Sequence, residues 1–118
     1  GTLLKDDPTG LGRIVRTPAG EFSRIVEHKD ASLAERTIKE VNMSTYLFKT
    51  PELLWALSRL ENSNAQGEFY LTDCPQILKD SGRKVDALPV LEPCESLSIN
   101  TIEELAIVES RMREMGYA

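Results

Sequence analysis

The apolar and polar positions near the start of the chain predict two short strands joined by a turn. The segment GRIVR at 12–16 has an apolar centre between polar ends, and EFSRIVE at 21–27 has a similar pattern. Between them lie Pro18, Ala19 and Gly20, which are typical of a tight turn. We therefore expect a β-hairpin in this part of the chain.

Helical and extended patterns alternate in the next part of the sequence. Ser32 is followed three residues later by Glu35, the pattern of a capping box, so a short peripheral helix is expected to extend to Lys39. The β-branched and aromatic residues at 41–48 predict a largely buried strand. A second helix is expected to begin at Thr50, and its apolar face consists of leucines at helical spacing: Leu53, Leu54, Leu57 and Leu60.

The same alternation continues to the end of the chain. Thr72 or Asp73 is expected to cap a third helix that extends through Asp80, and 84–91 is expected to form a strand. Thr101 then caps a last helix with apolar residues at intervals of three or four: Ile102, Leu105, Val108 and Met112. Strands alternating with helices predict an α/β fold, and the early hairpin predicts a mixed rather than a wholly parallel sheet.

Length and apolar patterning predict one globular domain outside the membrane. The 118 residues are enough for one hydrophobic core and too few for two, so we expect a single domain over 1–118. No apolar run reaches the ~18 residues of a membrane-spanning helix, and the first residues do not have the pattern of a signal peptide. The expectation is a cytoplasmic protein that does not bind to membranes.

Charge and residue types argue against two further classes of protein. Fourteen Lys and Arg residues against nineteen Asp and Glu residues give a net charge of −5, which repels a nucleic-acid backbone. Cys74 and Cys94 lack the close spacing of a zinc or redox pair, and His28 is the only histidine. We therefore expect no His/Cys metal centre, and two reduced, structural thiols.

The segment NAQGEFYLTD at 64–73 has the highest density of hydrogen-bonding chemistry in the chain. It combines amides, a glycine, two acids, a phenol and a hydroxyl between two helical patterns. A connection between helices does not need this many polar groups, and binding residues are common on loops that a rigid scaffold positions. The segment is therefore interpreted as part of a binding site.

Four single positions are candidates for ligand contacts, and each has a structural alternative. Gly12 lets a ligand approach a backbone N–H, or is a simple turn residue. Glu27 at the end of an apolar strand projects its carboxylate into a cleft or into solvent. Asn42 binds a ligand or makes a buried structural hydrogen bond. Asn100 offers its oxygen to a divalent cation or belongs to the start of the last helix.

Several blocks of the sequence together resemble one enzyme family. The blocks are DDPTGLGRIVR, IVEHKDAS, EVN, NAQGEFYLTD and the SIN before the last helix. They are similar, in this order, to blocks of the bacterial N-acetylglucosamine-1-phosphate uridyltransferases, and NAQGEFYLTD is the most specific of them. The resemblance implies the C-terminal half of a nucleotide-diphospho-sugar transferase domain. This is a Rossmann-like α/β fold with helices flanking a mixed sheet, and its second half binds the sugar phosphate.

The resemblance also implies a reaction and the residues that bind its substrates. The family joins UTP and N-acetylglucosamine 1-phosphate to form UDP-N-acetylglucosamine for cell-wall synthesis, and pyrophosphate is released. Asn100 would be a ligand of Mg²⁺, together with an aspartate in a part of the family domain that this chain does not contain. The implied substrate-binding residues are Gly12, Glu27 and Asn42 for the sugar, Tyr70 and Thr72 beside the sugar phosphate, and Asn100 at the metal.

Departures from the family pattern leave two alternatives open. Leu11 replaces a common Tyr, Met43 and Ser44 stand where Thr and Gly are usual, and 97–98 reads Leu-Ser where Glu-Gly is usual. A related hexose phosphate is therefore an alternative substrate. The glycine-rich phosphate loop of the family does not occur in these residues. The alternative function is therefore a catalytically inactive sugar-phosphate-binding or structural fragment, and a homo-oligomer is also left open.

Overall fold

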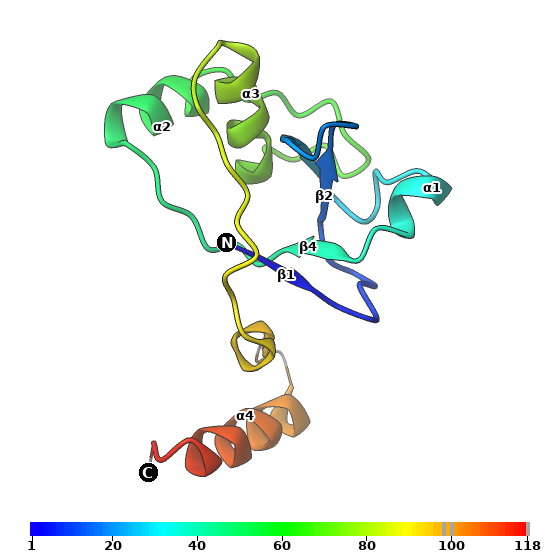
Figure 1. The fold of residues 1–118 in the computed structure, drawn as a ribbon, viewed down its shortest axis with the longest axis vertical. Coiled ribbons are helices and arrows are strands. Elements are labelled where there is room, and N and C mark those ends of the chain that lie inside the picture. The colour runs from blue at the N-terminus through cyan, green and yellow to red at the C-terminus, as the bar shows by residue number, and fades with distance from the viewer. Residues whose placement is uncertain (98, 100, 118) are drawn as a thin grey trace.

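The computed structural model describes residues 1–97, 99 and 101–117. These residues form a small sheet, two helices packed on one of its faces, and a C-terminal helix that lies apart from both (Figure 1). The order of the strands in the sheet is β1-β4-β2-β3. The expected combination of strands and helices is therefore present.

Antiparallel pairing joins all the neighbouring strands of this sheet. β2 (Arg13–Arg16) and β3 (Phe22–Val26) form the predicted hairpin, which is confirmed. β4 (Glu40–Asn42) pairs with β2 on one side and with β1 (Thr2–Leu4) on the other, both antiparallel. Within the described residues, the expectation of a mixed sheet is wrong. Parallel neighbours need long crossover connections, whereas β4 enters beside β2 in the opposite direction.

The strand register decides which side chains share a face. Arg13 is paired with Val26, so Gly12 and Glu27 continue this pairing beyond the strand ends. The backbone N–H of Asn42 donates to the Gly12 carbonyl at 2.9 Å, which places Asn42 beside Gly12. Since side chains alternate along a strand, Gly12, Glu27 and Asn42 lie on one face of the sheet.

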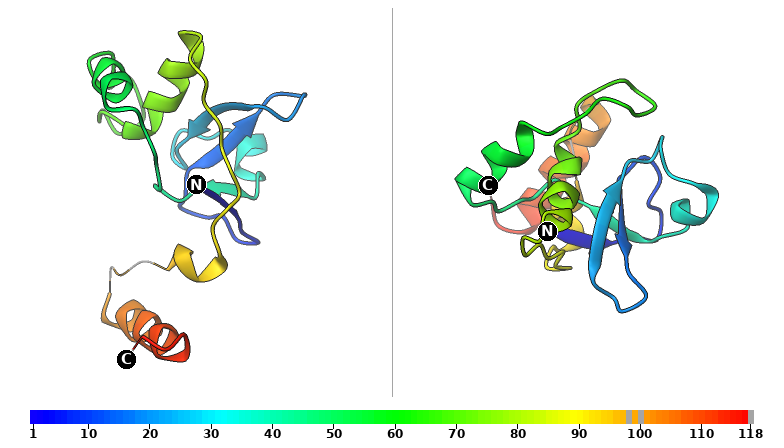
Figure 2. Two further views of the ribbon diagram at one scale, coloured as in Figure 1. Left: turned by 60° about the vertical axis from the view of Figure 1, so that its left-hand side comes forward. Right: turned by 90° about the horizontal axis from the view of Figure 1, so that it is seen from above.

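The hydrophobic core covers this same face. Ile14, Phe22 and Ile25 form one buried cluster, against which Tyr46, Val85 and Ala87 pack. A second cluster, Ala56, Cys74 and Leu78, lies between the helices α2 (Thr50–Leu57) and α3 (Cys74–Asp80). Val85 packs against both clusters, so the segment after α3 joins the helices to the sheet (Figure 2).

Local signals placed the helix starts correctly and their buried faces less well. In α1 (Leu33–Arg36), Ser32 and Glu35 form the predicted capping box, although the helix ends before Lys39. α2 begins at Thr50 as predicted, but Ala56 is its fully buried residue while Leu54 is 62% exposed. A 3₁₀ turn, η1 (Leu71–Asp73), precedes α3. Periodicity gives the spacing of an apolar face, and tertiary packing decides which part of it is covered.

Two predicted strands are wrong in whole or in part. The strand expected over 41–48 ends at Asn42, because Ser44 adopts a left-handed backbone conformation with φ 55°. The segment 84–91 is no strand, although the Thr2 N–H donates to the Leu88 carbonyl at 2.8 Å. Pro89 lacks an N–H and interrupts any further ladder.

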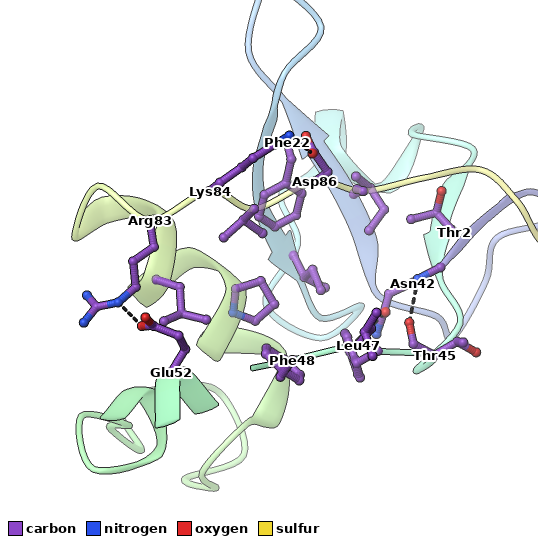
Figure 3. Close-up of a pocket in the computed structure, with 18 of the residues that line it drawn as sticks. Thr2, Phe22, Asn42, Thr45, Leu47, Phe48, Glu52, Arg83, Lys84 and Asp86 are labelled. Carbon is purple, nitrogen blue, oxygen red and sulfur yellow. Dashed lines mark hydrogen bonds and ion pairs between the residues drawn. The ribbon is translucent and has the colours of Figure 1, made fainter. Parts of the chain in front are cut away.

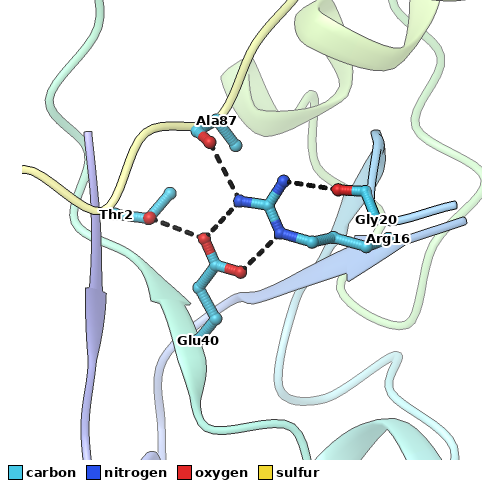
Figure 4. Close-up of polar contacts among 5 residues, drawn as sticks. All are labelled: Thr2, Arg16, Gly20, Glu40 and Ala87. Carbon is cyan, nitrogen blue, oxygen red and sulfur yellow. Dashed lines mark hydrogen bonds and ion pairs between the residues drawn. The ribbon is translucent and has the colours of Figure 1, made fainter.

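A network around Arg16 and Glu40 holds 84–91 against the sheet (Figure 4). Arg16 donates from Nε to Glu40 Oε2 at 2.7 Å and from a terminal nitrogen to Oε1 at 2.6 Å. The same guanidinium donates to the carbonyls of Gly20 at 3.0 Å and Ala87 at 2.9 Å. Thr2 Oγ1 donates to Glu40 Oε1 at 2.7 Å. One ion pair therefore joins β1, β2, β4, the hairpin turn and 84–91.

The last helix, α4 (Ile102–Glu114), confirms the predicted cap but does not pack on the sheet. Thr101 and Glu104 form a capping box at its start. A short 3₁₀ helix, η2 (Pro93–Ser96), precedes it. None of the α4 residues is buried, and apolar side chains such as Ile102, 81% exposed, face solvent. Among the described residues, no helix is long and apolar enough to cross a membrane.

Candidate ligand-binding site

Gly12 and Glu27 lie side by side where β2 begins and β3 ends. A Cβ atom built on Gly12 would lie 3.4 and 3.5 Å from the two carboxylate oxygens of Glu27, and 3.2 Å from Cγ2 of Ile25. Any side chain at position 12 would therefore occupy the space in front of this carboxylate. The glycine leaves that space free and keeps the carboxylate accessible.

Glu27 is half-buried and has unused acceptor capacity. Thr72 Oγ1 donates to Glu27 Oε1 at 2.9 Å. Among the described residues, no cation forms an ion pair with Glu27, and no hydrogen bond reaches Oε2. A carboxylate can accept about four hydrogen bonds. Glu27 is therefore suited to accept hydrogen bonds from a ligand that carries hydroxyl or amide donors.

Arg13 supports this pair from the opposite face of the sheet. Its side chain is only 1% exposed, and its guanidinium donates to the Leu11 carbonyl and lies 3.3 Å from His28 Nδ1. Arginine only donates, so Nδ1 of His28 is the acceptor in this contact. Leu11 and His28 are the neighbours of Gly12 and Glu27 in the sequence. Arg13 thus ties together the two chain segments that carry the candidate pair.

Asn42 is the third candidate on this face and is 7% exposed. Its side-chain oxygen Oδ1 accepts from the Ser44 backbone N–H at 3.2 Å and from the Tyr46 hydroxyl at 3.0 Å. In the described part of the chain, no hydrogen bond is made by the Asn42 side-chain nitrogen. The structural alternative for Asn42, a buried hydrogen bond, is therefore realised at the oxygen, while the nitrogen keeps its donors.

Two cavities open on this side of the molecule. The larger one, of about 670 Å³, lies between the sheet and the helices α2 and α3 (Figure 3). It is largely apolar, with Asn42 and Thr2 at the sheet and Glu52 and Arg83, which form an ion pair, at the helices. The smaller cavity, of about 460 Å³, contains the Glu27 side chain. The register thus brings Glu27 and Asn42 to one face, and the two side chains line different cavities.

Most of the charged residues that line the smaller cavity are acidic, and the exception is Arg24, which forms an ion pair with Glu35. Glu27, Asp30, Asp73 and Tyr70 all line it. Burial raises the pKa of Asp73, and the charges of Glu27 and Asp30 raise it further. Burial is also the main cause of the raised pKa of Tyr70. A ligand group that enters this cavity is therefore expected to be a hydrogen-bond donor or a cation rather than an anion.

The polar segment 64–73 uses much of its chemistry to build itself. Asn64 Oδ1 accepts from the backbone N–H groups of Gln66 at 3.1 Å and Glu68 at 3.2 Å. The Ala65 N–H donates to Asp30 Oδ1 at 2.7 Å, and Gln66 Nε2 donates to the Tyr70 hydroxyl at 2.7 Å. These bonds attach the loop to the turn after β3. Its polarity is therefore partly structural, and it brings Tyr70 and Thr72 next to Glu27.

The structure thus brings together five of the six predicted site residues. Gly12 lies beside Glu27 and accepts a hydrogen bond from the Asn42 backbone N–H, Thr72 donates to Glu27, and Tyr70 lines the same cavity as Glu27. Asn100 lies outside the described residues. Within those residues, no group of three or more His, Cys, Asp and Glu side chains could hold a metal ion. Magnesium binding at Asn100 therefore stays a prediction.

Sequence reasoning missed two residues that shape the site, Ser44 and Tyr46. Both were included in a predicted strand, where their polar groups had no assigned partner. The signal was the sequence Asn-Met-Ser, because an asparagine often accepts from the backbone N–H two residues later and ends an extended segment. Such a turn places the following residues beside the asparagine instead of along the strand.

The chain is similar in sequence to several known proteins. It is 47% identical over 113 residues to the bifunctional protein GlmU of Brevibacillus brevis, and this alignment covers 96% of the chain and 24% of the relative. It is 48% identical over 115 residues to GlmU of Acetivibrio thermocellus, covering 94% of this chain and 25% of the relative. GlmU of Clostridium tetani is 47% identical over 117 residues, covering 97% of the chain and 26% of the relative. No family model matches the chain.

The fold and these similarities together indicate the class of the chain, which is an α/β segment. The chain spans about a quarter of the length of its curated relatives. Identity of this level over nearly the whole chain also identifies the family. The chain belongs to the GlmU family and corresponds to one segment of the GlmU sequence. The recognition from the sequence blocks is thereby confirmed.

Proposed function

We propose that this chain supplies the sugar-binding part of a uridyltransferase. The reaction is the formation of UDP-N-acetylglucosamine from UTP and N-acetylglucosamine 1-phosphate, with release of pyrophosphate. Family membership supports this proposal, together with the arrangement of Gly12, Glu27 and Asn42 on one sheet face. The proposal includes a Rossmann-like domain of which this chain is the second half.

The observation that carries the proposal is the open carboxylate of Glu27 in front of Gly12. A sugar presents hydroxyl and amide donors on a compact ring, and a half-buried carboxylate with free acceptor positions binds such donors well. The missing side chain at position 12 provides the space that the ring needs. Thr72 fixes one carboxylate oxygen, so the other is left for the ligand.

The contribution of these residues to the reaction is binding and orientation. In a phosphoryl or nucleotidyl transfer, catalysis depends mainly on the position of the two reacting phosphates and on neutralising their charge. Contacts to the sugar ring from Glu27 and Asn42 would hold the 1-phosphate oxygen in line for attack on the α-phosphorus of UTP. Because these contacts are remote from the phosphates, they act through the position of the sugar.

Magnesium has a separate place in the proposal. A bound divalent cation would neutralise phosphate charge, and Asn100 is the proposed ligand from this chain. No step is assigned to it from the geometry, since the residue lies outside the described part of the chain. The acidic groups around Glu27 are not proposed as its ligands, because among the described residues no group of three or more His, Cys, Asp and Glu side chains could hold a metal ion.

The test is pyrophosphate release from UTP and N-acetylglucosamine 1-phosphate by the full-length protein that contains this chain. We expect turnover by the full-length protein, and none by residues 1–118 alone, because the phosphate loop of the family is not among them. Omission of UTP and replacement of the sugar by glucose 1-phosphate serve as controls. Absence of turnover with the full-length protein would contradict the proposal. Equal turnover with both sugar phosphates would instead support the alternative of a related hexose phosphate.

A further inference from the structure

Two donors converge on the side-chain oxygen of Asn42. The first is the backbone N–H of Ser44 at 3.2 Å, and the second is the hydroxyl of Tyr46 at 3.0 Å. Oδ1 of an amide offers two lone pairs, so both are used by this chain itself. The geometry is that of an asparagine whose oxygen faces inward to its own loop.

The Ser44 contact assigns the orientation of the amide. A tyrosine hydroxyl can donate or accept, so the Tyr46 contact alone is compatible with either end of the amide. A backbone N–H can only donate, and it therefore requires the oxygen of Asn42 on its side. The Ser44 N–H reaches this position because its residue adopts φ 55°. With the oxygen facing the loop, the NH₂ group points away from it.

We propose that Tyr46 is a positioning residue that holds the Asn42 amide with its NH₂ group toward the ligand. Asn42 then acts as a donor to an acceptor oxygen of the sugar phosphate, and Glu27 acts as an acceptor from the neighbouring cavity on the same face of the sheet. This inference rests on the proposed function, since it concerns the same site. It adds that Asn42 is the hydrogen-bond donor in its contact with the ligand, and that Tyr46 sets this orientation of the amide.

Packing of the Tyr46 ring makes it suitable for this role. The ring packs on the buried cluster of Ile14, Phe22 and Ile25, and its centroid lies 5.5 Å from that of Phe48. A ring held on two sides presents its hydroxyl at a defined point. Burial, with a smaller contribution from the charge of Glu27, raises the pKa of Tyr46 to about 12. The hydroxyl therefore stays protonated and able to donate at physiological pH.

The experiment uses steady-state kinetics of the full-length protein in four forms: parent, Tyr46→Phe, Asn42→Ala and the double variant. Tyr46→Phe keeps the packed ring and removes one hydrogen bond, which corresponds to an increase of about threefold to tenfold in the KM for the sugar phosphate. The KM for UTP should stay unchanged. Tyr117→Phe removes the same hydroxyl from a ring that is 61% exposed, and serves as the matched control.

The double variant separates a positioning role from a structural one. If Tyr46 acts through Asn42, Tyr46→Phe has no further effect on the sugar KM once Asn42 is alanine. Equal effects of Tyr46→Phe in both backgrounds, or no effect in the parent background, would overturn the inference while leaving the proposed function intact. A parent protein that does not turn over the sugar phosphate would overturn both.

Discussion

Two glutamates on the same face of the sheet differ in the way their carboxylates are used. Glu40 accepts hydrogen bonds from Arg16 on both oxygens and from Thr2 on one of them, and its side chain is 13% exposed. Glu27 accepts one hydrogen bond, from Thr72, and no cation pairs with it within the part of the chain that the structure describes. The first carboxylate is saturated by its own protein, and the second is open.

This difference separates a structural group from a group that is available to a ligand. A carboxylate that is fully paired has little to offer a ligand, and its removal leaves a partly buried guanidinium without a counterion. A carboxylate with free acceptor positions contributes little to folding and is available to ligand donors. The residue type and the location at a strand end are the same in both cases. The partners decide the role.

Loss of the structural carboxylate should have the largest effect on stability. We expect Glu40→Ala to lower the free energy of unfolding by about 2 to 3 kcal/mol, because Arg16 and Thr2 lose their shared acceptor. Arg16, which also donates to the Ala87 carbonyl of 84–91, loses the carboxylate that holds its guanidinium in place. Urea unfolding followed by circular dichroism measures this change. Glu21→Ala, an exposed glutamate on the hairpin, is the matched control. Equal losses in both variants would remove the distinction between paired and open carboxylates.

The same carboxylate should make stability depend on acid. Burial raises the pKa of Glu40, but hydrogen bonds from Arg16 and Thr2 and the Arg16 charge outweigh it, so the net pKa is lowered. Its stabilising contribution is therefore full above about pH 4.5, the usual value, and is lost as the pH falls through the lowered pKa. The stability difference between the parent and Glu40→Gln should shrink below about pH 4.5. A difference that is constant from pH 3 to pH 7 would contradict this.

Loss of the open carboxylate should affect substrate rather than stability. We expect Glu27→Ala in the full-length protein to lower kcat/KM for the sugar phosphate by roughly 5- to 150-fold, equivalent to about 1 to 3 kcal/mol. The sugar donors would lose their acceptor in a partly desolvated site. The urea midpoint should stay close to that of the parent. A large loss of stability with unchanged kinetics would show that Glu27 is structural.

A methyl group in front of the open carboxylate should have a smaller effect on the same kinetics. Gly12→Ala places Cβ 3.4 and 3.5 Å from the Glu27 oxygens, and 3.2 Å from Ile25 Cγ2. We expect the KM for the sugar phosphate to rise by about tenfold, with a loss of stability of about 1 kcal/mol from the tight contact with Ile25. Inhibition by the free sugar gives a second measure of the same space. An unchanged KM would mean that the ligand does not approach position 12.

The smallest effect is expected at Asp73. Its pKa is raised by burial and by the charges of Glu27 and Asp30, so the folded state disfavours its ionised form. Stability is then lost as the pH rises from about 3.8 through the raised pKa. Asp73→Asn should increase stability at pH 7 by less than about 1 kcal/mol, and the gain should vanish at pH 3. Asp80→Asn, exposed at the end of α3, is the control, and an equal gain there would argue against repulsion around Glu27.

The local features of this fold could be predicted from the sequence because their causes are local. The hairpin follows from two β-rich segments and the turn between them, and the caps at Ser32 and Thr101 follow from a hydroxyl and a glutamate three residues later. Each of these depends on interactions within a few residues. The strand β1 was missed because its three residues form a strand only through pairing with β4, far along the chain.

The sequence suggested which residues belong to the candidate site, but it did not predict the hydrogen bonds between them. The family blocks singled out Gly12, Glu27 and Asn42, and the register places them on one face. The hydrogen bonds of Tyr46 and Thr72 to these residues depend on how distant loops return to the sheet. Apart from the family resemblance, the sequence did not distinguish Glu27 from Glu40, because only the folded structure shows that Arg16 pairs with Glu40.

Binding of N-acetylglucosamine 1-phosphate to full-length Glu27→Gln and Glu40→Gln tests this distinction most directly. Calorimetric titration gives the Kd and a thermal scan gives the Tm of each variant beside the parent. We predict at least tenfold weaker binding with a nearly unchanged Tm for Glu27→Gln. For Glu40→Gln we predict a Tm lower by several degrees, with an unchanged Kd at a temperature where all three proteins are folded. A Glu27→Gln variant that binds as tightly as the parent would contradict the assignment of the open carboxylate to the ligand.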